Sequence, residues 1–175
     1  KQRRLLIIFF LGYCSWVPVS GFGALWGVSF LQQTLHTNTI NASHLCDIFW
    51  LGLGLGSIAI GVFSEYIKSH KLSMMLCFSL GLLSSLSLLF NNHLNFYISA
   101  VCLFILGCSA GAQALSFSLL KTQVSPVFFS AMSGLNNMSA IIGGACSQII
   151  IGYLIHLFSH QHSSLVSIRH ALLFI

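Results

Sequence analysis

Two short strings in this 175-residue chain have the spacing of catalytic motifs. Gly107-Cys-Ser109-Ala-Gly111 spells the GxSxG motif of a nucleophilic serine, and Ser118-Leu-Leu-Lys121 spells an SxxK motif. GxSxG chemistry requires a turn between a strand and a helix, with a histidine and an acid nearby. Here the string lies inside an apolar segment, and the SxxK string lacks its companion motifs. The sequence therefore predicts no enzyme activity.

The histidines and cysteines form no recognisable metal or redox site. His156, His160 and His162 are spaced closely enough for metal capture, but no acidic or thiol ligand accompanies them. The six cysteines contain no CxxC pair and lie at positions 14, 46, 77, 102, 108 and 146. This scatter favours small buried side chains over a disulfide framework. We expect neither a metal nor a cofactor.

The chain has only two acidic residues, Asp47 and Glu65, which lie near opposite ends of one apolar segment. Asp47 is expected in the first turn of a helix, where the helix dipole favours a carboxylate. Glu65 is expected at the other end of the same helix. Because neither acid is placed at the membrane midplane, this chain shows no evident proton carrier.

Most of these residues lie in long apolar segments. A helix needs about 20 apolar residues to cross the roughly 30 Å core of a bilayer. Five segments qualify, at 5–31, 45–66, 72–90, 96–120 and 127–158, and part of a sixth covers 165–175. With 56% hydrophobic and 5% charged residues, the chain cannot cover a soluble surface. We predict an all-α, polytopic transmembrane helix bundle, with residues 5–175 as the transmembrane domain.

The basic residues predict how the chain is oriented, because cytoplasmic loops carry the excess of lysine and arginine. Arg169 falls on one side, and the other six fall on the opposite side: Lys1, Arg3, Arg4, Lys68, Lys71 and Lys121. The amino terminus is therefore expected in the cytoplasm. Topology also explains the net charge of +5, so we expect the lipid bilayer as a partner and no nucleic acid.

Small residues recur along the spans and let helices pack closely. Three GxxxG pairs occur, at Gly23/Gly27, Gly52/Gly56 and Gly107/Gly111. Pro18 lies in the middle of the first span, where it removes a backbone hydrogen bond and bends the helix. We expect the glycines at helix contacts and Pro18 at a hinge.

An internal comparison indicates a repeat. Shifting the chain by 91 residues places Gly52 on Gly143, residues 57–61 on residues 148–152, and Gln32 on Gln123. The second and fifth spans are expected to run in opposite directions. This pattern predicts two three-helix units in an inverted-topology repeat, a common transporter architecture.

The polar break after the second span resembles the loop signature of the major facilitator superfamily, approximately G-x-x-x-D-R-x-G-R-R/K. Here it reads Gly61-Val-Phe-Ser-Glu-Tyr-Ile-Lys-Ser-His-Lys71. An acid and two lysines are in place, whereas Tyr66 replaces the usual arginine and Lys68 the usual glycine. The resemblance implies a role in gating for Gly61, Ser64, Glu65, Lys68 and Lys71.

Two further stretches, 21–32 and 134–144, resemble the first and fifth helices of the carboxy-terminal half of bacterial members of that superfamily. The resemblance covers the whole chain as helices seven to eleven and the start of helix twelve. It implies that residues 1–4 are a cytoplasmic stub of the central loop, and that an amino-terminal six-helix half lies upstream. The expected location is a bacterial inner membrane.

The resemblance implies a secondary active transporter that moves a small solute, with or without a coupling ion, by alternating access. Polar groups in the middle of a span are costly in lipid and face protein or a cavity. Trp16, Gln113, Asn136 and Asn137 are the expected lining of the substrate pathway. The amides also suit interhelical hydrogen bonds, as does Gln148.

Other functions remain open at this point. The chain also fits an independent small multi-pass membrane protein, acting as a scaffold or a dimerising mini-transporter. A membrane-embedded enzyme that depends on Ser109 is a third alternative. The sequence does not distinguish sugars, amino acids, drugs and organic anions as solutes.

Overall fold

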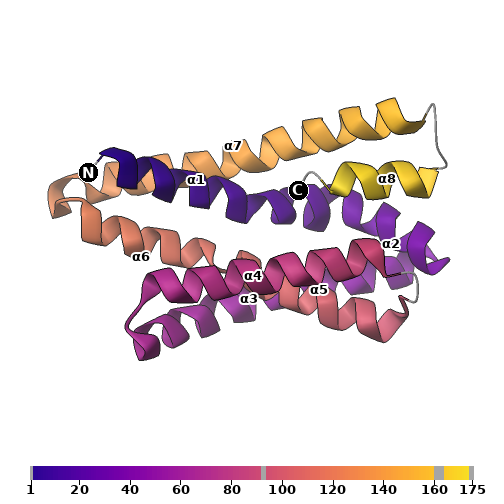
Figure 1. Cartoon of the computed structure of the whole chain (residues 1–175), viewed down its shortest axis with the longest axis horizontal. Helices are drawn as coiled ribbons and strands as arrows, with labels where there is room; N and C mark the ends of the chain where they lie inside the picture. The colour runs from indigo at the N-terminus through magenta and orange to yellow at the C-terminus, as the bar shows by residue number, and fades with distance from the viewer. Residues whose placement is uncertain (1, 92–93, 160–163, 174–175) are drawn as a thin grey trace.

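The computed structural model describes residues 2–91, 94–159 and 164–173, and every regular element in these ranges is a helix. The elements are α1 (Gln2–Pro18), the π-helical segment η1 (Val19–Trp26), α2 (Gly27–Leu35), α3 (Thr39–Ile67), α4 (His70–Phe90), α5 (Phe96–Ala110), α6 (Gln113–Gln123), α7 (Pro126–Ser159) and α8 (Ser164–Leu172) (Figure 1). Five stretches are long and apolar enough to cross a membrane: Gln2–Leu35, Thr39–Ile67, His70–Phe90, Phe96–Gln123 and Pro126–Phe158. The predicted all-α architecture with five spans is confirmed.

The helices extend beyond the predicted apolar limits because the polar breaks supply helix caps. The side-chain oxygen of Asn38 accepts a hydrogen bond from the Asn41 amide at 2.9 Å, and the Ser69 hydroxyl accepts one from the Leu72 amide at 3.3 Å. Asparagine is favoured at this position because its oxygen satisfies a backbone N–H at the start of a helix. The second span therefore begins at Thr39 rather than at residue 45.

This early start overturns the expectation for Asp47. The residue lies about two turns inside α3, beyond the reach of the first-turn amides. Its carboxylate instead lies 3.6 Å from Nδ1 of His44, and both side chains are exposed. The prediction was wrong because the polar residue Asn38 starts the helix before the apolar segment begins.

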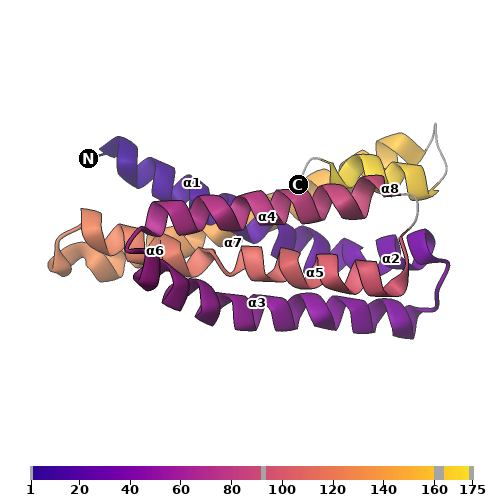
Figure 2. The ribbon, with the colours of Figure 1, turned by 60° about the horizontal axis from the view of Figure 1, so that its bottom comes forward.

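The spans run up and down, so the chain breaks gather at two ends of the bundle. The amino terminus, the α3–α4 turn and the α6–α7 turn share one end, which we call the basic end (Figures 1 and 2). The basic residues there are Arg3, Arg4, Lys68, Lys71 and Lys121. Arg169 on α8 lies toward the opposite end. All described basic residues thus follow the alternation that predicts a cytoplasmic amino terminus; the orientation itself stays a prediction.

The α5–α6 span is the most enclosed of the five. In its most apolar stretch 56% of the residues are buried, against 22% in α7. α5 packs mainly on α3 and α4, whereas α1 packs mainly on α7. The bundle therefore consists of an α3–α4–α5 group and an α1–α7 pair, joined where α6 meets α1 and α7.

Glycine determines how closely α3 and α5 approach. Four of the glycines in the predicted pairs lie at this crossing: Gly52, Gly56, Gly107 and Gly111. A Cβ atom on any of them would overlap backbone atoms of the other helix. The third pair differs, because Gly23 faces the ring of Phe49 and a Cβ on Gly27 would meet the Phe22 carbonyl of its own span.

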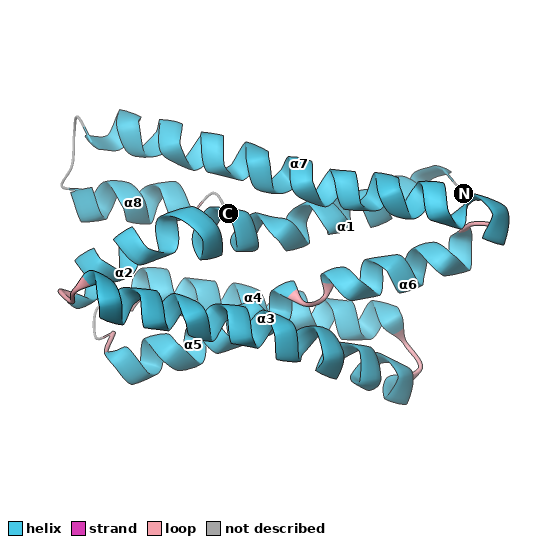
Figure 3. Cartoon of the chain, turned by 180° about the vertical axis from the view of Figure 1, so that it is seen from behind, coloured by secondary structure: helices cyan, strands magenta, loops and turns pink. Residues whose placement is uncertain are grey.

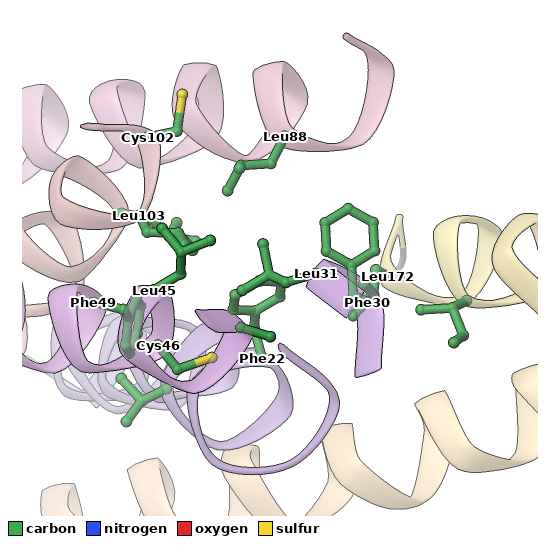
Figure 4. Close-up of a cluster of buried hydrophobic side chains, with 14 of the residues drawn as sticks. Phe22, Phe30, Leu31, Leu45, Cys46, Phe49, Leu88, Cys102, Leu103 and Leu172 are labelled. Atoms are coloured by element: carbon green, nitrogen blue, oxygen red, sulfur yellow. The ribbon is translucent and has the colours of Figure 1, made fainter. Parts of the chain in front are cut away.

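Two groups of buried apolar side chains fill the interior. The larger group lies toward the end opposite the basic end and joins η1, α2, α3, α4, α5, α7 and α8 (Figure 4). Phe30, Leu31, Leu45 and Phe49 are its most deeply buried aromatic and leucine members from α2 and α3. The smaller group consists of Ile60, Met74, Cys77, Ala112 and Leu115.

Candidate functional site

Two spans are interrupted near their middles. The first passes from α1 through η1 to α2, and the fourth passes from α5 to α6 through a turn at Gly111 and Ala112. Figure 3 shows this turn as a short loop near the middle of the bundle. Pro18 ends α1 directly before η1, so the irregular backbone begins where the hinge hypothesis places it. π-helical segments inside helices are frequent at functional sites.

Backbone groups freed by the interruptions find partners inside the protein. Gln148 of α7 donates a hydrogen bond from Nε2 to the carbonyl of Ser20 in η1, at 3.0 Å. At the other interruption the Gly111 amide bonds to carbonyls of α5 at 3.1 and 3.2 Å, and the Ala112 amide bonds to the Ser109 carbonyl at 3.0 Å. Irregular backbone is tolerated in a membrane only when its polar groups are satisfied in this way.

A chain of polar side chains connects the two interruptions to α7. The hydroxyl of Ser15, one turn before η1, donates to the side-chain oxygen of Gln113, the first residue of α6. One turn later on α6, Ser116 donates to the Gln113 carbonyl at 2.7 Å. Ser116 also accepts a hydrogen bond from Nδ2 of Asn136 at 2.7 Å. We call Ser15, Gln113, Ser116 and Asn136 the polar network.

Asn136 is the most enclosed member of the polar network, with an exposed fraction of 0%. Its Oδ1 atom faces α1, where a Cβ on Gly12 would lie only 2.8 Å away. Among the described residues this oxygen has no hydrogen-bond partner. Nearby, the Ser139 hydroxyl lies 3.0 Å from the Phe9 carbonyl and so links α7 to α1 directly. Because residue 12 is a glycine, Oδ1 of Asn136 can approach α1 closely.

The four residues predicted to line the substrate pathway occupy different places. Gln113 and Asn136 belong to the polar network, and Asn136 makes an interhelical hydrogen bond. Asn137 is exposed on α7, among exposed apolar residues such as Met138. Trp16 is half-buried, with its ring against Gly144 of α7. The structure therefore brings two of the four together and leaves Asn137 on the outer face of α7.

Sequence reasoning missed the serines of this region. Each of three serines makes a hydrogen bond between two helices. Ser15 joins α1 to α6, Ser116 joins α6 to α7, and Ser139 joins α7 to α1. A signal was present, because Ser116 follows Gln113 by three residues and Ser139 follows Asn136 by three. Residues three apart share a helix face. Amide and hydroxyl pairs at this spacing therefore mark a polar helix face inside the bundle.

The residues of the loop signature lie at the basic end. The Ser64 hydroxyl is fully buried and lies 2.5 Å from Nδ1 of His70, which ties the end of α3 to the start of α4. Lys68 ends α3 in the left-handed conformation, with φ of 55°. Glu65 and Lys71 are exposed, and no ion pair is recorded for Glu65 among the described residues. Gly61 has open space around its Cβ direction. Their gating role stays a prediction.

The strings with catalytic spacing lie within helices. The Ser109 hydroxyl donates to the Leu106 carbonyl of its own helix at 2.9 Å, near the end of α5. No strand precedes it in the described residues. For the histidine group, His160 and His162 lie outside the described residues, and no group of three possible metal ligands occurs within them. The Ser109 hydroxyl is thus bonded within its own helix, and the absence of enzyme activity stays a prediction.

A cavity of about 260 Å³ lies on the other side of the first interruption, between α1, α4, α5 and α8. Pro18 and Phe22 line it together with leucines of α4 and α5 and the three serines Ser15, Ser85 and Ser109. The junction of α1 and η1 is therefore packed against α7 on one side and incompletely packed on the other.

No model of a known protein family matches this chain, and no curated protein matches it either. Inferences about function therefore rest on the residues at the two interruptions and on the relation between them.

Proposed function

We propose that this chain is the carboxy-terminal half of a secondary active transporter of the major facilitator superfamily, which moves a small solute by alternating access. The observation that carries the proposal is the contact between two interrupted spans: Ser15 beside η1 binds Gln113 at the start of α6. Transporter sites typically lie near the membrane midplane and are formed by discontinuous helices at the interface of two repeats. An upstream six-helix half is the expected partner.

The positions of the interruptions support an inverted repeat. η1 begins at Val19, and α5 ends at Ala110, which is 91 residues later. This is the same offset that aligns the second span with the fifth. Under it the first span corresponds to the fourth, so both members of the pair are interrupted at the same place. A chance similarity of glycine-rich segments would not be expected to match backbone irregularities.

Two contacts between helices are also related by the 91-residue offset, which is added for one partner of the contact and subtracted for the other. A Cβ on Gly52 of α3 would meet the Phe104 carbonyl of α5, and a Cβ on Gly143 of α7 would meet the Tyr13 carbonyl of α1. Gly143 lies 91 residues after Gly52, and Tyr13 lies 91 residues before Phe104. Two units related by a two-fold axis must exchange contacts in this reciprocal way.

A second pair of contacts repeats the relation. A Cβ on Gly111 would lie 2.6 Å from the Ser57 amide nitrogen, and Gln148 donates to the Ser20 carbonyl at 3.0 Å. Ser57 corresponds to Gln148 and Gly111 to Ser20 by the 91-residue offset. These contacts support two repeats that pack through α3 with α5 and through α7 with α1.

The proposal assigns different tasks to the two asparagines of α7. Asn136 holds α6 and α7 together at the interruption and acts as a positioning residue. Asn137 is exposed among apolar residues, where an amide facing lipid would be unfavourable. It lies 11 residues, about three turns, from Gln148, so the two residues share one side of α7. We assign Asn137 to the water-filled solute pathway between the two halves.

Thiol labelling tests this assignment. The six native cysteines are replaced in the intact transporter, and Asn137→Cys is compared with Met138→Cys, which faces another side of α7. In membrane vesicles a water-soluble, membrane-impermeant maleimide should label position 137 and not position 138. A solute found by thermal-shift screening should slow labelling at 137. Equal labelling at both positions, or none at 137, would remove Asn137 from an aqueous pathway.

A further inference from the structure

A second cavity lies outside the interrupted spans, lined by residues from the carboxyl end of α4 and from α8. Its volume is about 300 Å³, within the lower range for ligand sites. The apolar lining comes from Leu89 and Phe90 of α4 and from Val166 and Leu173 of α8. Phe90 and Leu173 are 62% and 43% exposed, so the cavity opens to the outside of the bundle.

Arg169 of α8 gives this cavity a cationic side, and the adjacent residue His170 also lines it. The His170 ring packs against Phe158 of α7 with centroids 5.6 Å apart, which holds α8 to α7. The acidic residues of the chain lie elsewhere: Asp47 is beside His44, and Glu65 is at the basic end. The cavity thus combines a positive group with an exposed apolar wall, and no acidic residue lines it.

The depth of Arg169 suits a particular ligand. α8 begins at Ser164, so Arg169 lies roughly 8 Å along the helix axis from its start, at 1.5 Å per residue. Arginine side chains near the end of a membrane helix can extend toward the headgroups, where lipid phosphates are available. Arginine has five N–H donors in a planar fork that matches a phosphate. Arg169 and His170 also interact with other groups of the chain.

We propose that this cavity binds an anionic phospholipid, with its phosphate at Arg169 and His170 and an acyl chain against Phe90 and Leu173. The charge of the cavity is complementary to the phosphate, and its wall is complementary to the hydrocarbon. A bound lipid at this place would join α4 to α8 and close the side of the bundle where their outer parts meet.

Lipid binding to the purified intact protein tests the proposal. Phosphatidylglycerol is added in detergent, and binding is followed by native mass spectrometry. Phosphatidylcholine is the zwitterionic comparison, diacylglycerol the comparison without phosphate, and inorganic phosphate the soluble source of the same group. We expect phosphatidylglycerol to bind at least several-fold more tightly than phosphatidylcholine, and diacylglycerol and inorganic phosphate to bind weakly.

Two matched variants identify the site. Arg169→Gln keeps a polar, hydrogen-bonding side chain, although a shorter one, and removes its charge. Lys121→Gln makes the same kind of change at the basic end. Arg169→Gln should weaken phosphatidylglycerol binding about tenfold, the effect expected for one charge-assisted hydrogen-bonding group, whereas Lys121→Gln should leave it unchanged. Arg169→Lys keeps the charge and should retain part of the binding, which guards against loss through misfolding.

Three outcomes would overturn the proposal. Unchanged binding in Arg169→Gln would place the lipid elsewhere. Equal losses in Arg169→Gln and Lys121→Gln would indicate non-specific attraction between a basic protein and acidic lipid. Inorganic phosphate binding as tightly as phosphatidylglycerol would identify a soluble anion as the ligand.

Discussion

Asn136 and Asn137 are neighbours in sequence, yet their environments differ completely. Helix geometry turns successive side chains by about 100°, so one asparagine points into the bundle and the other away from it. Asn136 donates to Ser116 and is fully buried, whereas Asn137 is exposed. Stability and transport should therefore depend on different members of this pair.

Replacing Asn136 with alanine should destabilise the protein. The change leaves the Ser116 hydroxyl without its donor and opens space between α6 and α7. Hydrogen bonds between membrane helices contribute about 0.6 kcal/mol on average, and loss of packing adds to this, so we expect a loss of about 1 kcal/mol or more. Thermal unfolding in detergent measures it. Asn137→Ala is the matched control and should change stability by less than about 0.5 kcal/mol; equal losses would contradict the assigned roles.

Replacing Asn137 with leucine should abolish or strongly alter solute uptake. Leucine is similar in size but removes the amide that we place in the solute pathway. Uptake of a solute identified by screening, in proteoliposomes containing the intact transporter, measures the effect. The melting temperature should stay near that of the unmodified protein, which separates loss of function from loss of fold. Uptake at the original rate would eliminate Asn137 as a pathway residue.

At the scale of elements, glycine and serine residues lie where the spans cross and where they are interrupted. α3 and α5 cross through backbone contacts that only glycine permits at four positions. The interrupted spans are stable in lipid because their freed backbone groups have hydrogen-bond partners. Gln148 donates to the Ser20 carbonyl, and the Ala112 amide donates to the Ser109 carbonyl. In lipid these short-range contacts replace the hydrophobic effect as the force that joins helices.

Gly56→Ala should destabilise the bundle, because the new Cβ would overlap the backbone of Cys108 on α5. Overpacking of this kind typically costs about 1–3 kcal/mol. Gly54→Ala, on the same helix, is the control: its Cβ would meet nothing within 4 Å. That variant should be neutral or more stable by up to about 1 kcal/mol, since alanine favours helix over glycine. Thermal unfolding of the two variants compares them, and a Gly56→Ala protein as stable as Gly54→Ala would show that the crossing tolerates a wider separation.

At the scale of the whole molecule, the contacts are consistent with two units exchanged by a two-fold axis. Gly52 and Gly143 occupy corresponding positions, and each lies against a backbone carbonyl of the other unit. Both interruptions also fall at corresponding positions. In transporters built from such repeats, alternating access is largely a rigid-body rocking of one repeat or bundle against the other.

The proposed two-fold relation predicts that Gly52→Ala and Gly143→Ala have similar effects. Each new Cβ would push apart one of the two corresponding crossings, α3 with α5 or α7 with α1. We expect each variant to lose about 1–3 kcal/mol of stability. Gly134→Ala, whose Cβ would meet nothing within 4 Å, is the control on α7. A large loss in one variant and none in the other would count against the repeat.

The sequence alone determined the number of spans, their order and the alternation of the basic residues. These features follow from local composition, because a membrane demands about 20 apolar residues for each crossing and leaves polar residues for the breaks. It also located Pro18 at an irregular segment and two of the three glycine pairs at a helix crossing. Helix ends were less accurate, because caps such as Asn38 lie in the polar breaks rather than in the apolar segments.

Only the tertiary structure decided which polar residues meet. Ser15 and Gln113 are 98 residues apart in sequence, and Ser139 and Phe9 are 130 apart. No periodicity within one helix encodes such contacts, because they depend on how two helices cross and rotate about their axes. The rotation of α7 about its axis buries Asn136 and exposes Asn137. The packing of α8 places Arg169 beside the end of α4. The positions of the spans in the sequence thus follow from the apolar residues that a lipid bilayer requires. The polar network and the α4–α8 cavity depend instead on how the helices pack against one another.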